Sequence, residues 1–377
     1  MIDRFEIISS GSSRPNAERI IFCDGTGGSL YRADTDLELS HWRPNRTPAE
    51  FRAGTSTEIC FRFLERPRPG SWTVAVNNHV DVDGILSVYV LVQSDHARAH
   101  RQTIVEAAEM GDFWGWGESP AQRVFQGITH LMEQGGAGKA IYEEAFRRIP
   151  ALIDGSDPLV PEIEASLAPL RQGVELVEAG RIIRNQIDPR LAHYNIPLAV
   201  AGDDDARASY APEFNEAISP KAILWPHVRA RWDAQRVCLV STERQAGWFH
   251  DLCLPGYLLA DTAGRWLVPG LTYHDSMSSY EIRHDGLVAA MQELQRQEAA
   301  GLRCVTDHGG LTLRVGLLDS ESQATTGQWG LGGTALPFGE DLQKRFPVVG
   351  RFLDELGQPA VSHLAPDEVA KAFEGIF

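Results

Sequence analysis

The sequence has little positive charge and no long apolar run, and each shortage excludes a class of partner. Its 377 residues include 35 basic and 51 acidic side chains, which gives a net charge of −16. Binding to a long nucleic acid depends on clustered positive charge that neutralises phosphates, so we expect no such partner. We expect no membrane partner either, since no segment is long and apolar enough to span a bilayer.

Cysteine is also scarce, and its pattern excludes a disulfide framework. The five cysteines are scattered along the chain, and none belongs to a Cys-x-x-Cys pair. An odd, unpaired set is typical of reduced thiols. The first residues lack the basic start and apolar core of a signal peptide. Together these observations predict a cytoplasmic protein, because the cytoplasm keeps thiols reduced.

The length and the hydrophobic pattern predict two domains of the α/β class. A chain of 377 residues exceeds one average domain, although a single large α/β unit is the alternative. From residue 220 onward, short strand-like runs are separated by Gly, Pro and Asp turns, which is typical of a more β-rich domain. We therefore predict an α/β domain over 1–215, with a mainly parallel sheet flanked by helices. A second, smaller α+β domain should cover 216–377.

The stretch from Ser71 to Val92 combines a strand pattern, a polar turn and an apolar run. The alternation from Trp72 to Val76 predicts a strand, and the run from Ile85 to Val92 predicts a buried helix. Between the two, polar side chains occur at every second position. In extended geometry such side chains project to one side at the strand's carboxyl end.

These polar residues, His79, Asp81 and Asp83, predict a metal site. Two neighbouring carboxylates repel each other unless a positive charge neutralises them. One nitrogen and several oxygen ligands favour Mn²⁺ or Mg²⁺, as one or two ions, over a closed zinc site. The carboxyl end of a parallel strand is also where α/β sheets bind ligands. The alternative is an acidic strand end that caps the next helix, with Asp83 as the cap.

The segment NNHVDVDGILS, residues 77–87, resembles the first motif of the DHH phosphoesterase superfamily, particularly its RecJ-like branch. The resemblance implies that His79, Asp81 and Asp83 bind the catalytic metal ions. It makes Asp154 a candidate for the family's second aspartate motif. It also implies a substrate motif rich in glycine and histidine in a small second domain, for which His308 in VTDHGGLTL is the nearest counterpart. The chain contains no Asp-His-His triplet, which leaves the family's third motif unassigned.

Asp112 is a further candidate metal ligand. It stands in GDFWGWGESP, among aromatic residues and after a helical pattern that we expect to end at Gly111. A pair of metal ions needs a carboxylate from outside the first motif, and we expect Asp112 to supply it. A simple turn residue is the alternative.

The stretch from Leu37 to Ala53 is proline-rich and predicts an irregular loop with substrate contacts. It contains His41, Arg43 and Arg46, and loops on a rigid scaffold often carry binding residues. The arginines suit a negatively charged ligand, or they pair with local acids. Earlier in the chain, the glycine-rich DGTGGS at 24–29 predicts a tight turn rather than an anion-binding loop.

The function that these observations favour is that of a metal-dependent hydrolase. The resemblance implies a phosphoesterase that acts on a small, soluble phosphorylated substrate. One alternative is a non-catalytic ligand- or metal-binding protein of the same fold, which the missing triplet supports. Another is a metal-dependent biosynthetic enzyme that acts on an amide or amino acid, because a fold does not determine its function. The sequence leaves open whether the chain forms a homodimer.

Overall fold

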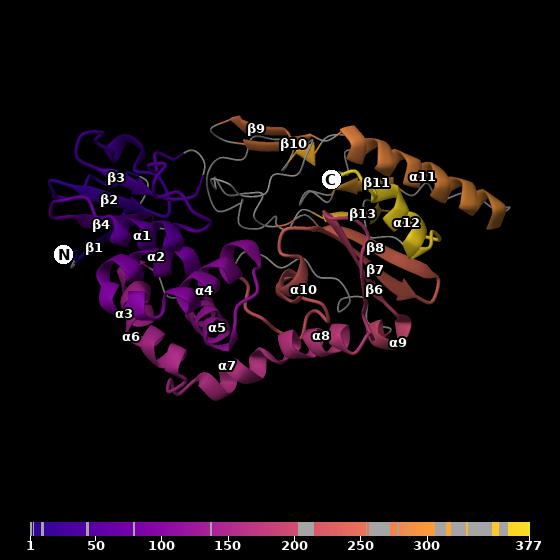
Figure 1. Ribbon diagram of the computed structural model, residues 1–377, viewed down its shortest axis with the longest axis horizontal. Coiled ribbons are helices and arrows are strands. Elements are labelled where there is room, and N and C mark those ends of the chain that lie inside the picture. The colour runs from indigo at the N-terminus through magenta and orange to yellow at the C-terminus, as the bar shows by residue number, and fades with distance from the viewer. Residues whose placement is uncertain are drawn as a thin grey trace. The chain divides into compact units, whose positions relative to one another are not determined.

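The chain divides into two compact units (Figure 1). Among the described residues, the first unit comprises Met1–Leu167 and Asn215–Ile218, and the second comprises the rest. The main stretch of the first unit stops at Leu167, before the predicted boundary at residue 215, and only residues 215–218 return to it among those described. The second unit, expected to be the smaller one, spans more of the chain. The computed structural model describes residues 2, 4–8, 11–42, 45–77, 80–135, 138–202, 215–253, 255, 272–276, 279–283, 285–305, 314–317, 329–330, 349–353 and 361–377.

The first unit contains a four-stranded sheet in which every described pair of strands is parallel. Its strands are β1 (Phe5–Ile8), β2 (Ile20–Cys23), β3 (Leu37–Leu39) and β4 (Thr73–Asn77), in the spatial order β1-β4-β2-β3. The β3 strand lies in the stretch that we expected to be an irregular loop, so that expectation was wrong at its start. Because parallel strands end at one edge, the residues after β2, β3 and β4 are brought together.

Helices flank this sheet, which confirms the predicted α/β class. They are α1 (Ser56–Glu65), α2 (Val82–Val92), α3 (Ser94–Ala99), α4 (Arg101–Phe113), α5 (Ser119–Glu133), α6 (Gly138–Asp154) and α7 (Val160–Ser166), with a short 3₁₀ turn, η1 (Gly28–Leu30). The α2 helix is buried over all but its last residue. It packs against β2 and β4 on the sheet and against α1, α4, α5 and α6. Contacts on every side explain why its sequence is apolar all round.

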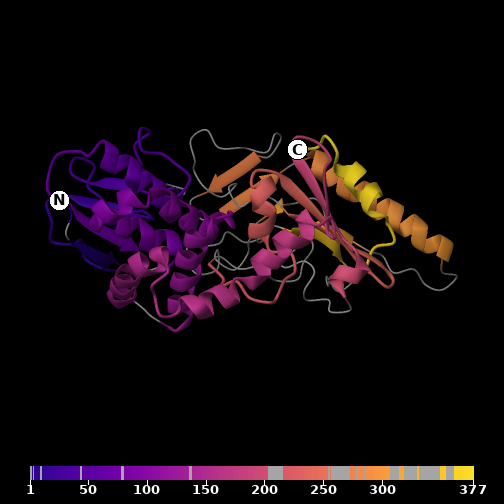
Figure 2. The same ribbon diagram turned by 60° about the horizontal axis from the view of Figure 1, so that its bottom comes forward.

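The second unit contains a mixed six-stranded sheet in the order β11-β13-β8-β7-β6-β5 and a three-stranded sheet in the order β12-β10-β9. The strands are β5 (Ile183–Gln186), β6 (Leu191–Ile196), β7 (Val237–Arg244), β8 (Gly247–Cys253), β9 (Thr272–Ser276), β10 (Ser279–Arg283), β11 (Arg314–Leu317), β12 (Trp329–Gly330) and β13 (Val349–Leu353). The helices are α8 (Ala168–Glu178), α9 (Leu198–Ala201), α10 (Pro226–Asp233), α11 (Asp285–Val305) and α12 (Pro366–Phe373). The helix α12 contacts β6 and β8 (Figure 2). Across the described parts of both units, no helix has the length and apolar character needed to cross a bilayer.

A chain of hydrogen bonds crosses β6, β7 and β8 in the interior of the second unit. His250 Nε2 donates to the Leu364 carbonyl at 3.1 Å, because that oxygen can only accept. His250 Nδ1 must therefore accept from Ser241 Oγ (2.9 Å), which in turn accepts from His193 Nε2 (2.9 Å). All three side chains are buried. Burial lowers the pKa of each imidazole to about 4, so both are neutral at pH 7, which is the state that this direction of the bonds requires.

Candidate metal centre

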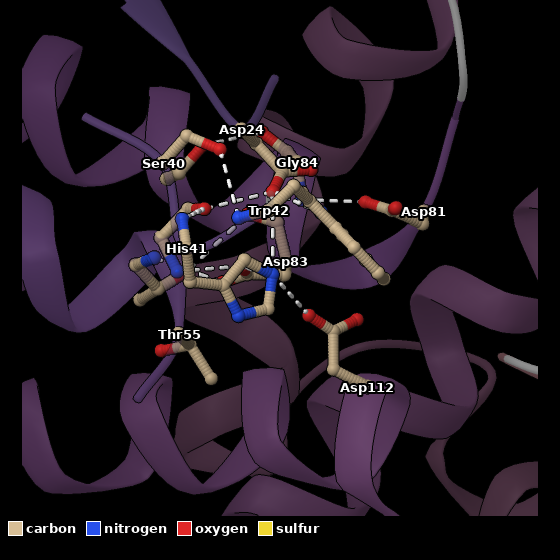
Figure 3. Close-up of polar contacts among 12 residues, drawn as sticks. Asp24, Ser40, His41, Trp42, Thr55, Asp81, Asp83, Gly84 and Asp112 are labelled. Carbon is tan, nitrogen blue, oxygen red and sulfur yellow. Dashed lines mark hydrogen bonds and ion pairs between the residues drawn. The ribbon is translucent and has the colours of Figure 1, made fainter. Parts of the chain in front are cut away.

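Five ionisable side chains gather at the carboxyl edge of the parallel sheet (Figure 3). Asp24 follows β2, His41 lies two residues after β3, and Asp81 lies beyond β4 at the start of α2. Asp83 belongs to the first turn of α2, and Asp112 to the last turn of α4. Three adjacent strands and two helices therefore supply one site, and every member is at most 5% exposed.

His41 lies at the centre of this group. Its Nδ1 is 2.8 Å from the Gly54 carbonyl oxygen, so Nδ1 carries the proton that this bond requires. Its Nε2 lies 3.1 Å from Asp112 Oδ2, 3.6 Å from Asp83 Oδ2 and 3.7 Å from Asp24 Oδ1. A single ring nitrogen thus faces three carboxylates. This role differs from the expected substrate contact in a surface loop, because the side chain is completely buried.

Asp112 points toward His41 and is 2% exposed. Within the part of the chain that the structure describes, neither of its carboxylate oxygens has a hydrogen-bond partner of good geometry, and the same holds for His41 Nε2. The helix α4 continues past Gly111 to Phe113 and ends at Trp114, which has a left-handed backbone. The expected helix end at Gly111 was therefore wrong by two residues, and Asp112 is a buried member of the last turn of α4.

Asp81 and Asp83 anchor two different helices. Asp81 is the N-cap of α2, and its Oδ1 accepts from the Gly84 amide at 2.6 Å. Asp83 accepts from the amides of Ser56 (2.7 Å) and Thr57 (2.9 Å), the first two residues of α1. The predicted alternation of side chains stops at Asp81, because Asp83 is already helical. The residue that caps α2 is therefore Asp81, and the alternative prediction of Asp83 as the cap was wrong.

Asp24 is a member of the site that the sequence reasoning missed. It is fully buried, and its Oδ1 accepts from Trp42 Nε1 (3.0 Å) and Ser56 Oγ (2.8 Å). Its backbone is left-handed, with φ of +44°, a conformation that aspartate tolerates better than most residues. Because DGTGGS was assigned to a tight turn, its first residue, Asp24, was not considered as a ligand. The available signal was its place directly after a buried strand, the same signal that marked the acids after β4.

The carboxylates set the protonation of this site. Burial lowers the pKa of His41, but Asp112, Asp83 and Asp24 more than offset that effect and raise the pKa to about 9. Burial and the charge of Asp24 raise the pKa of Asp83, and burial and the charge of Asp83 raise that of Asp112 well above its usual range. Without an ion, the site therefore favours a protonated His41 and makes it costly for Asp83 and Asp112 to be ionised together.

The geometry of these residues fits a divalent cation. One ligand atom from each of Asp24, His41 and Asp83 can be chosen so that all three lie within 4.8 Å of one another. Neutral His41 would present the Nε2 lone pair, because Nδ1–H is held by a backbone carbonyl, the usual arrangement behind a metal-bound histidine. Asp112 adds two buried oxygens for which the described residues offer no hydrogen bond of good geometry. The donor set is mostly oxygen with one nitrogen, which suits Mn²⁺ or Mg²⁺.

The other predicted site residues fall outside this cluster or outside the described residues. Arg46 donates to buried Glu38 (2.9 Å) and lies over the Tyr31 ring, the local pairing that was the alternative to substrate binding. Asp154 is exposed at the end of α6, where it accepts from the Ser156 amide at 2.9 Å. The remaining three, His79, Arg43 and His308, are outside the described residues.

Gly84 is needed because the site leaves no room for a side chain. An added Cβ would lie 2.7 Å from Asp81 Oδ1 and 3.0 Å from Asp24 Oδ2. We expect Gly84→Ala to displace both carboxylates and to cost about 1–3 kcal/mol of stability, as overpacking does. Affinity for Mn²⁺, measured by calorimetry, should fall although every ligand is retained. Gly127→Ala, whose new Cβ would lie nearest to Leu152 and Ile163 in the first unit, is the matched control that should leave Mn²⁺ affinity unchanged.

Comparison with known proteins adds one match. No curated protein and no solved structure matches the chain. Residues 4–155 match the model of a family of unknown function, DUF6687, and this region contains Asp24, His41, Asp81, Asp83 and Asp112.

Proposed function

We propose that the first unit is a metal-dependent hydrolase, a phosphoesterase that acts on a small, soluble phosphorylated substrate. The observation that carries the proposal is the ring nitrogen of His41, which faces three aspartates from separate segments at the carboxyl edge of a parallel sheet. A cluster that only capped helices would not need these groups to converge. The resemblance of residues 77–87 to the DHH phosphoesterases supports the choice of reaction.

The chain's own residues would hold and enclose the ion. Asp24, His41 and Asp83 are the first ligands, and Asp112 and Asp81 stand beside them. Four carboxylates and a neutral histidine carry the charge of two divalent ions, which supports a pair. The rings of Trp42 and Phe113 lie edge-on to His41, with centroids 4.7 and 5.6 Å away, and limit the entry of water. A bound Mn²⁺ or Mg²⁺ would supply Lewis-acid catalysis.

The test is metal binding by the purified chain, followed by hydrolysis of bis(4-nitrophenyl) phosphate. We expect one or two Mn²⁺ ions per chain by calorimetry and elemental analysis, with turnover that chelation abolishes. Asp112→Asn should weaken Mn²⁺ binding at least tenfold, the size of effect seen when a metal site loses a supporting group. Asp154→Asn, at an exposed aspartate, is the matched control and should bind like the wild type.

A metal-binding protein without catalysis is the second candidate. It is favoured by the engagement of Asp81 and Asp83 as helix anchors, which gives both residues a use apart from chemistry. Tight Mn²⁺ binding without hydrolysis would select this candidate. If the wild type bound no Mn²⁺, both candidates would fail, and His41 would be an imidazolium that neutralises buried carboxylates.

We also propose that the protein works in the cytoplasm. The support is that Cys23, Cys60, Cys238 and Cys253 are all free thiols. Unpaired cysteines are usual where the surroundings are reducing. Fractionation of the native cell with an antibody to the chain tests this location.

A further inference from the structure

A short segment from far along the chain returns to the first unit next to the metal centre. Residues Asn215–Ile218 belong to that unit, although the chain on both sides of them belongs to the second. Gln126 of α5 fixes the segment: its Nε2 donates to the Ile218 carbonyl at 3.0 Å, and its Oε1 accepts from the Ile218 amide at 2.9 Å. Gln126 is completely buried. This pair of bonds sets the position of the segment on α5.

Asn215, the first residue of the segment, reaches the start of α2. Its Oδ1 accepts from the Val82 amide at 2.9 Å, across 133 positions of sequence. Val82 stands between the two aspartates of the motif. The first amides of a helix lack partners within the helix, and side chains from elsewhere must satisfy them. The Asp81 side chain accepts from the Gly84 amide, and the Asn215 side chain accepts from the Val82 amide.

The side-chain amide of Asn215 also lies close to α4, the helix that carries Asp112. A Cβ added to Gly111 of α4 would lie 2.5 Å from Asn215 Oδ1 and 3.1 Å from Val82 Cβ. One side-chain oxygen is therefore packed between the start of α2, with Asp81 and Asp83, and the end of α4, with Asp112. Gly111 is what allows this close approach.

We propose that Asn215 is a positioning residue of the metal centre, which sets the spacing between the aspartates of α2 and Asp112. The inference rests on the proposed metal-dependent function. It assigns part of the site to a segment outside the residues 4–155 that match the family model. The site is then complete only when the chain has passed through residues 168–214 and returned.

The test measures Mn²⁺ affinity of full-length variants by calorimetry. Asn215 has a φ of +55°, so Asn215→Gly removes the amide without adding left-handed strain. We expect this variant to bind Mn²⁺ roughly tenfold more weakly, the low end of the effect of groups that orient ligands. Asn215→Asp keeps the accepting oxygen and tolerates the same φ, so it should retain wild-type affinity or exceed it. Asn185→Gly, at an exposed residue of β5, is the matched control.

Gly111→Ala provides a second route that leaves Asn215 unchanged. The new methyl should displace the amide and weaken Mn²⁺ binding, and in the Asn215→Gly background it should cost much less, because the clash with Oδ1 is gone. Equal Mn²⁺ affinity of the wild type and Asn215→Gly would overturn the positioning role, even if the melting temperature fell. Failure of Asn215→Asp to bind would overturn the role of the oxygen. A wild type that binds no Mn²⁺ would overturn the proposed function and this inference together.

Discussion

Lowering the pH from 7 to 4 is expected to reduce the stability of the second unit by roughly 6 kcal/mol through two histidines, His193 and His250. Burial lowers the pKa of each to about 4, whereas an unfolded histidine has a pKa of about 6.5. Above pH 6.5 neither state takes up a proton, so the full stability is present. As the pH falls toward 4, only the unfolded chain is protonated. Each histidine then costs about 3 kcal/mol.

Hydrogen exchange of the β7 amides, corrected for the intrinsic exchange rate at each pH, measures this loss within the second unit. Between pH 6.5 and 4, His193→Gln should reduce the slope of the unfolding free energy against pH by the amount that one proton contributes. His363→Gln is the control, because the His363 side chain is exposed. If His193→Gln had the same dependence of unfolding free energy on pH as the wild type, His193 would titrate in the folded unit as it does in the unfolded chain, and the expected effect of its burial would be wrong.

Asp83→Ala is expected to destabilise the first unit by about 4 kcal/mol and to abolish tight Mn²⁺ binding. The large cost in stability follows from the two α1 amides, Ser56 and Thr57, both of which donate to the Asp83 carboxylate. Both amides are buried and would lose a charged partner. The effect combines a structural and a functional loss, so variants that separate the two are needed.

Three asparagine variants make that separation. Asp81→Asn should keep its stability, because asparagine is as good an N-cap as aspartate. The free energy of unfolding of Asp112→Asn should also lie within about 1 kcal/mol of the wild-type value, since the change breaks no well-formed hydrogen bond among the described residues. Asp83→Asn should be clearly less stable than both, because its NH₂ group would face a backbone donor. Urea unfolding in the presence of chelator gives the comparison, and equal stability of all three would contradict the anchoring role of Asp83.

Local patterns predicted the part of the fold that depends on neighbours in sequence. The strand from Trp72, the polar turn and the buried helix from Ile85 appear close to where the periodicity put them, since each is determined by its own residues. Asp112, singled out from its local setting, is buried and lies near His41, while its role as a metal ligand stays a prediction. The parallel sheet of the first unit was predicted from the hydrophobic pattern of this part of the chain.

Long-range pairing was beyond the sequence. Asp24 joins the site only because β2 lies beside β4, and no local pattern gives the order of strands. Asp83 looked like a cap of its own helix, yet its partners are 26 and 27 residues earlier in the chain. Asn215, which accepts from the Val82 amide, is separated from it by 133 positions of sequence. Each miss concerns a partner that only the folded chain brings near.

The strand order β1-β4-β2-β3 has a consequence for how the chain is made. Among the described strands of the first sheet, β1 pairs only with β4, and β4 is the last of the four to leave the ribosome. A nascent chain that stops before Thr73 would contain β2 and β3 as a pair and β1 without a neighbour. The strand that completes the sheet is followed within a few residues by Asp81 and Asp83. Assembly of the sheet during translation and arrival of its acidic residues should therefore be nearly the same event.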